Sequence, residues 1–541
     1  MFIPREASTL LDTFVDQRMR TANTPGACVA LTDRERLLGL STHGFANVAA
    51  RAPVMSDHLF EIGSISKSFT AIAILQLCER GQVDLDAAVT RYLPWFHVPS
   101  DYGPIALHHL LSHTAGIIRG TDFTTEGHQE VWALRETRAT APPGTHFHYS
   151  NVGYKALGLV LEEMLDQSYG EIVQQRILDP LGMDSTEPVI THDTRKRLAE
   201  GYECFYDDRP AHPSYPLVPA TWLETGTADG SIASPAADMA TYVRMLLNHG
   251  RGSGGRVLSE ESFQLMTQRV IQLPLGDEDH GDYYGCGLQI GGGEGHTIIG
   301  HGGGMVGYYA SILADLDDGL GVVVLTNGPG EPVEIARFAL DLLRSAVHVK
   351  QLPSLPQTSV PTCIGQPADF AGRYESESGA FTLAVQGERL IFVRDGDRVA
   401  LEGQGEDRFY VPHPGFSRHL FRFGREDGEV VEAFYGSDWY VNERYRGPTR
   451  FDFPTEWAAY AGHYRSHNPW YTNFRVVMRK GKLYLVEPAG DEEVLVPLGN
   501  GVFRIGHDDR SPERLCLYSI LNGRALRANL SGCDYYRTFT P

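Results

Sequence analysis

Ser64 and Lys67 have the residue types and the spacing of a nucleophile and its base. They lie in Ser64-Ile65-Ser66-Lys67, between a strand-like run at 59–62 and an apolar helical pattern that begins near Phe69. Residues three apart on a helix project from the same side, so we expect the Ser64 hydroxyl near the Lys67 amine. Serine becomes a good nucleophile when a base takes its proton, and a lysine with a lowered pKa is such a base. A helix-capping serine followed by a solvated lysine fits the same residues.

The segment Tyr149-Ser150-Asn151 offers two further groups suited to this chemistry. It follows Pro142-Pro143-Gly144 and precedes a helical pattern over 153–162. A tyrosine hydroxyl can relay a proton, and an asparagine amide can hold both the lysine and a substrate. The alternative is a buried tyrosine beside a helix-capping asparagine.

A third element is rich in glycine. The run Gly300-His301-Gly302-Gly303-Gly304 precedes a strand expected over 308–313. Glycines let the backbone approach a ligand closely, and backbone N–H groups can receive an oxyanion. A glycine-rich hairpin with no catalytic role is the alternative.

The scaffold for these residues is predicted to be one sheet combined with helices. Apolar periodicity indicates, in chain order, a helix at 10–19, strands at 27–31 and 38–40, helices after Gly63 and at 155–166 and 236–248, strands at 287–290 and 321–325, and a helix at 332–348. A chain that starts helix–strand–strand and ends strand–strand–helix predicts one sheet built from both ends, with a helical insertion between them.

The pattern of apolar residues and prolines changes in the second part of the chain. Residues 349–366 carry three prolines and little periodicity, and a fourth proline follows at 367, which predicts a linker. Short alternating strands follow, and Phe370-Ala371-Gly372-Arg373-Tyr374 reappears as Tyr460-Ala461-Gly462-His463-Tyr464, about 90 positions later. We therefore expect two all-β domains, at 367–451 and 452–541. Small antiparallel barrels are favoured because they remove sheet edges, and two small sandwiches are the alternative.

The amino-acid composition and net charge bear on which kinds of molecule the protein could bind. The chain has 541 residues, 42% of them hydrophobic, and a formal net charge of -21, so binding to nucleic acid or to an anionic membrane is not expected. No apolar run approaches the length of a membrane-spanning helix, and no signal-peptide pattern is seen at the N-terminus. Seven cysteines without a Cys-x-x-Cys pair are typical of cytosolic free thiols. A cytoplasmic protein is expected.

The three elements, in this order and spacing, resemble those of the serine β-lactamase and penicillin-binding-protein superfamily. The class C β-lactamase and D-aminopeptidase branch is most similar, over roughly residues 8–347. Further stretches that carry the resemblance are Leu107-His108-His109-Leu110-Leu111-Ser112-His113-Thr114-Ala115-Gly116, Pro180-Leu181-Gly182-Met183 and Asp229-Gly230-Ser231-Ile232-Ala233-Ser234. The resemblance implies an α/β (α+β) β-lactamase-like catalytic domain at 1–348, followed by two eight-stranded antiparallel barrels.

The resemblance also implies a role for each site residue. Ser64 is expected to be the acylated nucleophile, Lys67 its base and Tyr149 a proton relay toward the leaving group. Asn151, His301, Gly303 and Gly304 are expected to bind the substrate, and the N–H groups of Ser64 and Gly304 to form the oxyanion hole. No cofactor and no metal are implied, because the histidines at 108, 109 and 113 lie in a structural stretch of this family without partners at metal spacing.

His301 departs from the β-lactamase pattern. Most β-lactamases have Lys-Thr-Gly here, whereas the D-aminopeptidase-like branch has His-x-Gly, as in His301-Gly302-Gly303. Histidine is mostly neutral at pH 7, so a fixed positive anchor for a β-lactam carboxylate is weakened.

These features predict a serine hydrolase that cleaves amide bonds through an acyl-enzyme on Ser64, acting on short linear or D-amino-acid-containing peptides. A carboxylesterase or weak β-lactamase with the same mechanism is the first alternative. A non-hydrolytic ligand-binding or sensing protein is the second, although such a protein would not need Ser64, Lys67, Tyr149 and Asn151 together. The expected partner is a small peptide, amide or ester substrate, and a homodimer is compatible with the sequence.

Overall fold

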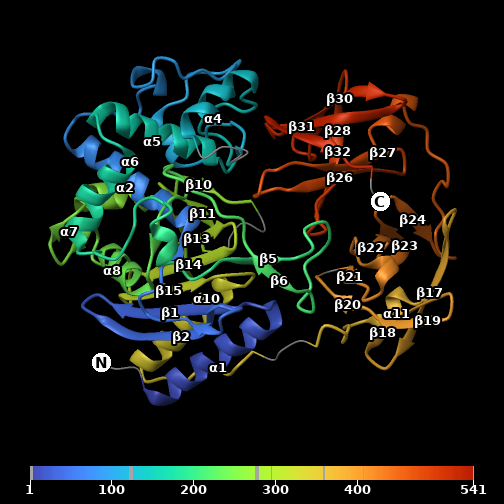
Figure 1. Ribbon diagram of the computed structural model, residues 1–541, viewed down its shortest axis with the longest axis horizontal. Helices are drawn as coiled ribbons and strands as arrows, with labels where there is room; N and C mark the ends of the chain where they lie inside the picture. The colour runs from blue at the N-terminus through green and yellow to red at the C-terminus, as the bar shows by residue number, and fades with distance from the viewer. Residues whose placement is uncertain are drawn as a thin grey trace. The chain divides into compact units, whose positions relative to one another are not determined.

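The computed structural model describes residues 4–120, 126–274, 280–293, 295–356, 360–405 and 407–539 (Figure 1). Its internal contacts divide the chain into two compact units. The first comprises Met1–Phe205, Pro216–Leu355 and Asp509–Pro512, and the second comprises Tyr206–Tyr215, Pro356–Asp508 and Glu513–Pro541. Each unit is described by itself.

A nine-stranded antiparallel sheet forms the centre of the first unit. Its strands, in spatial order, are β10 (Ile271–Gln272), β11 (Tyr283–Tyr284), β12 (Gln289–Gly291), β13 (Ile298–Met305), β14 (Tyr308–Asp315), β15 (Leu320–Thr326), β1 (Gly26–Asp33), β2 (Leu37–Asn47) and β3 (Ala52–Pro53). Strand β1 pairs with β15 in a register that runs from Ala27 opposite Thr326 to Asp33 opposite Leu320. The prediction that both ends of this part of the chain build one sheet is confirmed, and Figure 1 shows the blue β1 and β2 beside the olive β15.

Helices cover both faces of this sheet, which explains why every residue of β15 is buried and most are apolar. Val322 and Val324 pack against α1 (Arg5–Ala22) and α10 (Pro332–Val347). Val323 and Leu325 belong to the larger core on the opposite face, together with α2 (Ser66–Glu79) and α8 (Ala236–Leu247). Strand side chains alternate between faces, so one run of valines and leucines serves two cores.

The helical insertion surrounds α2. Twelve consecutive residues of this helix, from Ser66 to Leu77, are buried. A helix that is apolar on every side belongs in the interior, and α2 packs there against α5, α6 and α9. The remaining helices of this unit are α3 (Leu107–Leu111), α4 (Gly127–Ala133), α5 (Asn151–Leu165), α6 (Tyr169–Val173), α7 (Asp179–Leu181) and α9 (Glu260–Met266). Its short strand pairs are β4 (Phe60–Glu61) with β7 (Ala233–Ser234), β5 (Tyr202–Cys204) with β6 (Leu217–Pro219), and β8 (Arg251–Gly252) with β9 (Gly255–Arg256).

The second unit contains two antiparallel barrel-like sheets. The first has the order β19-β18-β17-β16-β24-β23-β22-β21-β20, and its two end strands are joined in the chain by the single residue Leu401. The second is a closed barrel of eight strands, β25 to β32. Barrels rather than sandwiches are therefore confirmed, although the first has nine strands and is nearly closed instead of closed.

The strands of these sheets have the following bounds. The first sheet contains β16 (Gly372–Ser376), β17 (Gly379–Gln386), β18 (Arg389–Arg394), β19 (Asp397–Ala400), β20 (Glu402–Gly403), β21 (Arg408–Tyr410), β22 (Phe421–Glu426), β23 (Glu429–Tyr435) and β24 (Asp438–Val441), preceded by the short helix α11 (Pro367–Phe370). The barrel contains β25 (Gly462–Arg465), β26 (Asn473–Arg479), β27 (Lys482–Val486), β28 (Glu492–Gly499), β29 (Val502–Ile505), β30 (Arg514–Leu521), β31 (Arg524–Leu530) and β32 (Cys533–Arg537).

The repeat seen in the sequence corresponds to the same contact in both sheets. The buried Tyr374 donates a hydrogen bond from its hydroxyl to the carbonyl of Phe370, at 3.0 Å. In the barrel, Tyr464 makes the equivalent bond to Tyr460, at 2.7 Å. Each tyrosine thus ties the first strand of its sheet to the short helical segment that precedes it.

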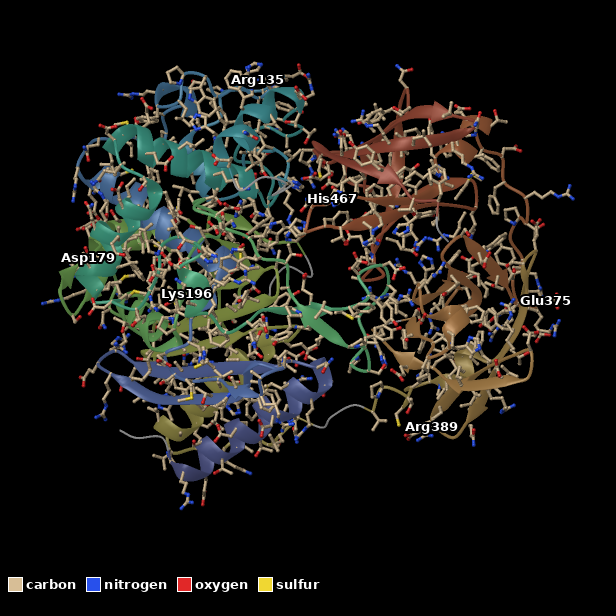
Figure 2. The ribbon with its side chains drawn as sticks, viewed as in Figure 1. Arg135, Asp179, Lys196, Glu375, Arg389 and His467 are labelled. Atoms are coloured by element: carbon tan, nitrogen blue, oxygen red, sulfur yellow. The ribbon has the colours of Figure 1, made fainter. Side chains whose placement is uncertain are left out.

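Several charged side chains lie on the outside of each unit. Figure 2 labels several of them, including Asp179, Lys196, Glu375 and Arg389, which are all exposed. None of the described helices is both long enough and apolar enough to cross a bilayer.

Candidate active site

A short strand pair positions Ser64. Strand β4 pairs with β7, and the N–H of Ile62 donates to the carbonyl of Ile232 at 3.0 Å. The chain then enters a 3-10 turn, Gly63–Ile65, in which Gly63 has φ +52°. Glycine adopts that conformation without a Cβ clash, and an added Cβ on Gly63 would lie only 2.7 Å from the amide nitrogen of Gly304. The half-buried Ser64 therefore lies directly beside the glycine-rich segment.

Lys67 lies one helical turn further on and is fully buried. Its Nζ donates a hydrogen bond to Ser64 Oγ at 3.0 Å and another to the backbone carbonyl of Asp229 at 2.8 Å. The same Nζ lies 5.0 Å from the centroid of the Tyr149 ring and 5.7 Å from that of Tyr154. The Lys67 amine thus lies next to the Ser64 hydroxyl, as expected, and the Tyr149 ring lies over the amine.

Ser150 fixes the segment that carries Tyr149 and Asn151. Its hydroxyl accepts a hydrogen bond from the N–H of Gly153 at 3.1 Å and donates to the carbonyl of Ile118 at 2.7 Å. The residue that caps α5 is therefore Ser150, whereas Asn151 is the first residue of the helix. The N–H of Asn151 donates to the carbonyl of Arg119 at 2.7 Å. Ser150, and neither of its two neighbours, therefore makes the side-chain cap of this helix.

The glycine-rich segment at 300–304 lies within strand β13, and the strand predicted after it is β14. Strand β12 pairs with β13 from Ile298 to Gly300 and ends there, so the rest of that edge faces the turn that carries Ser64. A Cβ on Gly303 would lie 1.9 Å from the carbonyl oxygen of Ile62 and 3.4 Å from the amide nitrogen of Ser64. Only glycine permits this approach, which places the amides of Ser64 and Gly304 on neighbouring segments.

Two buried histidines flank Tyr149, and both are held neutral. The centroid of the Tyr149 ring lies 4.2 Å from that of His113 and 6.4 Å from that of His301. Burial, with Lys67 nearby, lowers the pKa of His301 to about 4, although the carbonyl of Gly302 opposes that shift. Burial, Lys67 and His301 also hold the pKa of His113 well below its usual range. Lys67 therefore has two uncharged imidazoles in its surroundings at neutral pH.

Three contributors to this site were not predicted from the sequence. They are the backbone carbonyl of Asp229, which accepts from Lys67, the buried His113, and Tyr284, whose hydroxyl lies 2.9 Å from His301 Nε2. Backbone carbonyls carry no sequence signal. Tyr284 comes from the short strand β11, where an aromatic residue is typical of any strand.

A cavity of about 610 Å³ lies elsewhere in the first unit. Its lining comprises Leu93, Trp95, His128, Leu159, Glu162, Glu163, Asp166, Gln167, Ser168 and Glu171. None of the predicted site residues is among them, so this cavity is separate from the candidate site.

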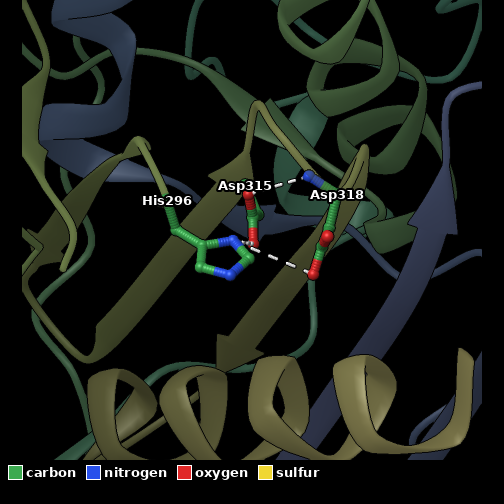
Figure 3. Close-up of side chains that lie close together, drawn as sticks. All are labelled: His296, Asp315 and Asp318. Atoms are coloured by element: carbon green, nitrogen blue, oxygen red, sulfur yellow. Dashed lines mark hydrogen bonds and ion pairs between the residues drawn. The ribbon is translucent and has the colours of Figure 1, made fainter. Parts of the chain in front are cut away.

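His296, Asp315 and Asp318 form the group with metal-ligating side chains found in the described part of the chain (Figure 3). His296 Nδ1 lies 3.1 Å from a carboxylate oxygen of Asp315, which is fully buried. That same oxygen accepts hydrogen bonds from the guanidinium of Arg344, one of them at 2.7 Å from Nε. Because Arg344 already supplies the positive charge for Asp315, the group joins β14 to α10 as an ion-pair network.

Comparison with known proteins identifies the family of the chain. A model of the Beta-lactamase family matches residues 11–346. Penicillin-binding protein 4 from Amycolatopsis lactamdurans is 29% identical over 373 residues, which cover 66% of this chain and 95% of the relative. Protein Rv1367c of Mycobacterium tuberculosis is 30% identical over 273 residues, which cover 45% of this chain and 68% of the relative.

Solved structures show the same architecture. The octameric penicillin-binding protein homologue from Pyrococcus abyssi superposes with a TM-score of 0.59 at 26% identity, covering 80% of this chain and all of the other. The D-amino acid amidase from Ochrobactrum anthropi SV3 superposes with a TM-score of 0.52 at 24% identity, covering 63% of this chain and 98% of the other, which shows the fold alone. The family match spans most of the first unit, including Ser64, Lys67, Tyr149 and His301. The chain therefore belongs to the Beta-lactamase family and is a serine hydrolase of the acyl-enzyme type.

Proposed function

We propose that the protein is a serine amidase or peptidase that acts on short linear or D-amino-acid-containing peptides and amides. The observation that carries the proposal is the 3.0 Å hydrogen bond between the buried Lys67 and Ser64, with Tyr149 beside the amine. Ser64 attacks the carbonyl carbon of the scissile bond while Lys67, in its uncharged form, takes the hydroxyl proton. Tyr149 then passes a proton to the leaving amine, and water releases the acyl group from Ser64.

We assign to the backbone N–H groups of Ser64 and Gly304 the role of donating hydrogen bonds to the oxyanion of the tetrahedral intermediate. The close approach of Gly63 and Gly303 to the opposite segment supports this assignment, because it brings the two backbones together without intervening side chains. Preorganised N–H groups of this kind stabilise charge that develops in the transition state. Asn151, at the start of α5, is assigned to positioning of the substrate.

The neutral His301 favours amide substrates over β-lactams. The pKa of His301 is lowered to about 4, so the third motif supplies no positive charge near pH 7 for the carboxylate of a β-lactam. The D-amino acid amidase of the same fold supports an amide of a D-amino acid as the first substrate to try. A β-lactam is the second, since one relative is named a penicillin-binding protein.

A substrate panel tests the proposal. The protein is incubated with L- and D-amino-acid amides, linear peptides, nitrophenyl esters and a chromogenic cephalosporin, and kcat/KM is ranked. The proposal expects an amide or a peptide to rank first. Fast turnover of esters with none of amides would identify a carboxylesterase instead, and covalent capture without turnover would identify a sensing protein.

The remaining parts of the proposal concern assembly and location. We infer that the protein acts in the cytoplasm on a small peptide, amide or ester substrate and that it forms a homodimer. The homologue from Pyrococcus abyssi is octameric, so light scattering of the purified full chain should count the copies. Cell fractionation tests the location.

A further inference from the structure

Both ring nitrogens of His301 are engaged by the protein itself. Nδ1 lies 2.5 Å from the carbonyl oxygen of Gly302, and Nε2 lies 2.9 Å from the hydroxyl oxygen of Tyr284. The histidine is only 4% exposed, so neither nitrogen is turned toward bulk solvent. This arrangement bears on the way in which His301 could contact a substrate.

Counting protons defines the tautomer of the ring. A carbonyl oxygen only accepts hydrogen bonds, so the contact with Gly302 requires a proton on Nδ1 of His301. A neutral imidazole carries one N–H, which leaves a lone pair on Nε2. The Tyr284 hydroxyl must then donate to Nε2. The lowered pKa of His301, which results mainly from burial, is consistent with the neutral form.

Tyr284 is suited to hold a ring in place because it is itself immobilised. Its side chain is fully buried. The Tyr284 ring packs 4.8 Å from His113 and 5.6 Å from Phe147, measured between ring centroids. The Tyr284 hydroxyl that donates to His301 is therefore held in place by the packing of its ring against His113 and Phe147.

We propose that Tyr284 is a positioning residue that holds His301 as the neutral Nδ1–H tautomer, so that this motif presents no free N–H donor to the substrate. The proposal deepens the proposed function and, in its second part, rests on it. Substrate groups beside this ring meet an uncharged surface whose hydrogen-bonding atoms are already used. A carboxylate next to the scissile bond gains nothing from His301, whereas an amide-capped group at that place loses nothing.

The tautomer is measured by 15N NMR of the full chain labelled at its histidine nitrogens. The difference between wild type and His301→Gln assigns the signals of His301. We expect a protonated Nδ1 and an unprotonated Nε2 from pH 6 to pH 8. In Tyr284→Phe the hydroxyl that donates to Nε2 is removed, and we expect the ratio of the Nε2–H to the Nδ1–H tautomer to rise about fivefold or more. Tyr283→Phe, which removes a half-buried hydroxyl from the same strand, should leave the ratio unchanged.

A protonated Nε2 in the wild type, or an unchanged ratio in Tyr284→Phe, would overturn the proposal. This measurement needs no turnover, so it stands even if the proposed amidase function fails. Circular dichroism checks that both tyrosine variants fold. If Tyr284→Phe does not fold, the 15N NMR spectrum of the wild type alone still decides which nitrogen of His301 is protonated.

The consequence for substrate choice has its own readout. The ratio of kcat/KM for a peptide with a carboxylate beside the scissile bond to that for its amide-capped twin is compared among the variants. We expect a higher ratio in Tyr284→Phe, because Nε2 can then carry a proton and donate it, and no change in Tyr283→Phe. An unchanged ratio in a Tyr284→Phe protein whose tautomer has shifted would overturn the effect on substrate choice.

Discussion

The Nζ of Lys67 lies 3.0 Å from the Oγ of Ser64 and is held there by a second bond to the backbone carbonyl of Asp229. Both acceptors are fixed by the fold, because Ser64 follows the β4–β7 strand pair and Asp229 lies just before β7. Lys67 itself has no exposed surface. The amine is therefore held in contact with the hydroxyl of Ser64.

Replacement of Lys67 by Ala should reduce turnover by at least ~100-fold, because Ser64 then has no base to take its proton. The Asp229 side chain provides the control, since Lys67 bonds to the backbone of this residue and not to its carboxylate. Asp229→Asn should keep most of the activity. Rates of both variants on the best substrate of the panel decide the point, and a Lys67→Ala protein with near-normal kcat would exclude lysine as the base.

Replacement of Tyr149 by Phe should lower kcat by about 100- to 10,000-fold, the usual contribution of general acid–base catalysis. The ring remains, so its packing 4.2 Å from His113 and over Lys67 is kept and the fold should be unaffected. Steady-state kinetics with an amide and with an activated ester make the comparison. The ester should lose less, because its leaving group needs less protonation. Equal activity of the variant and the wild type on the amide would contradict the relay.

Adding one methyl group at Gly303 should disable the site, whereas the same change at Gly304 should not. A Cβ at Gly303 would lie 1.9 Å from the carbonyl of Ile62 and must push β13 away from Ser64. Displacement of about 1 Å in an active site costs on the order of 100-fold in rate. At Gly304 the nearest atoms to an added Cβ are those of the Tyr309 ring, at 3.9 Å, and the backbone N–H is retained. Similar kcat/KM for Gly303→Ala and Gly304→Ala would contradict this geometry.

The buried carboxyl of Glu61 should make stability decrease with pH. This side chain is 5% exposed, and burial raises its pKa from 4.5 to about 8. Between those two values the folded protein keeps a proton that the unfolded chain has lost, so the free energy of unfolding falls as pH rises and levels off above pH 8. Thermal inactivation midpoints of wild type and Glu61→Gln from pH 5 to pH 9 test this. The wild-type midpoint should fall more steeply, and parallel curves would show that Glu61 does not titrate in this window.

The parts of the site that the sequence predicted are those governed by local geometry. Ser64 lies in the 3-10 turn that leads into α2, and Lys67 lies three residues later in the first turn of that helix. Side chains three residues apart along such a helical path lie on the same side. The pairing of β1 with β15 was predictable for a similar reason, since apolar runs at both ends of the first unit need partners. The tandem repeat likewise predicted two similar sheets.

The parts that the sequence did not predict depend on distant residues. The glycine-rich segment precedes the predicted strand, which is β14, but it also lies in a strand of its own, β13, which was not predicted. The close approach of Ile62 to Gly303 excludes a side chain there, so this strand lacks the apolar residues that would have indicated it. The contact of Tyr284 with His301 joins β11 to β13, which do not pair with each other. The extra strand of the first barrel-like sheet comes from the two-residue β20, which is too short to give an alternating pattern.

Mass spectrometry of a trapped acyl-enzyme tests the central claim most directly. The full chain is mixed with a nitrophenyl ester or a slowly released amide analogue, quenched in acid during turnover, and digested for peptide mapping. The account predicts that the mass of one acyl group is added to the peptide containing Ser64, and that no adduct forms in Ser64→Ala, which should fold but not turn over substrate. An adduct on another residue, or steady hydrolysis by Ser64→Ala, would contradict the assignment of Ser64 as the nucleophile.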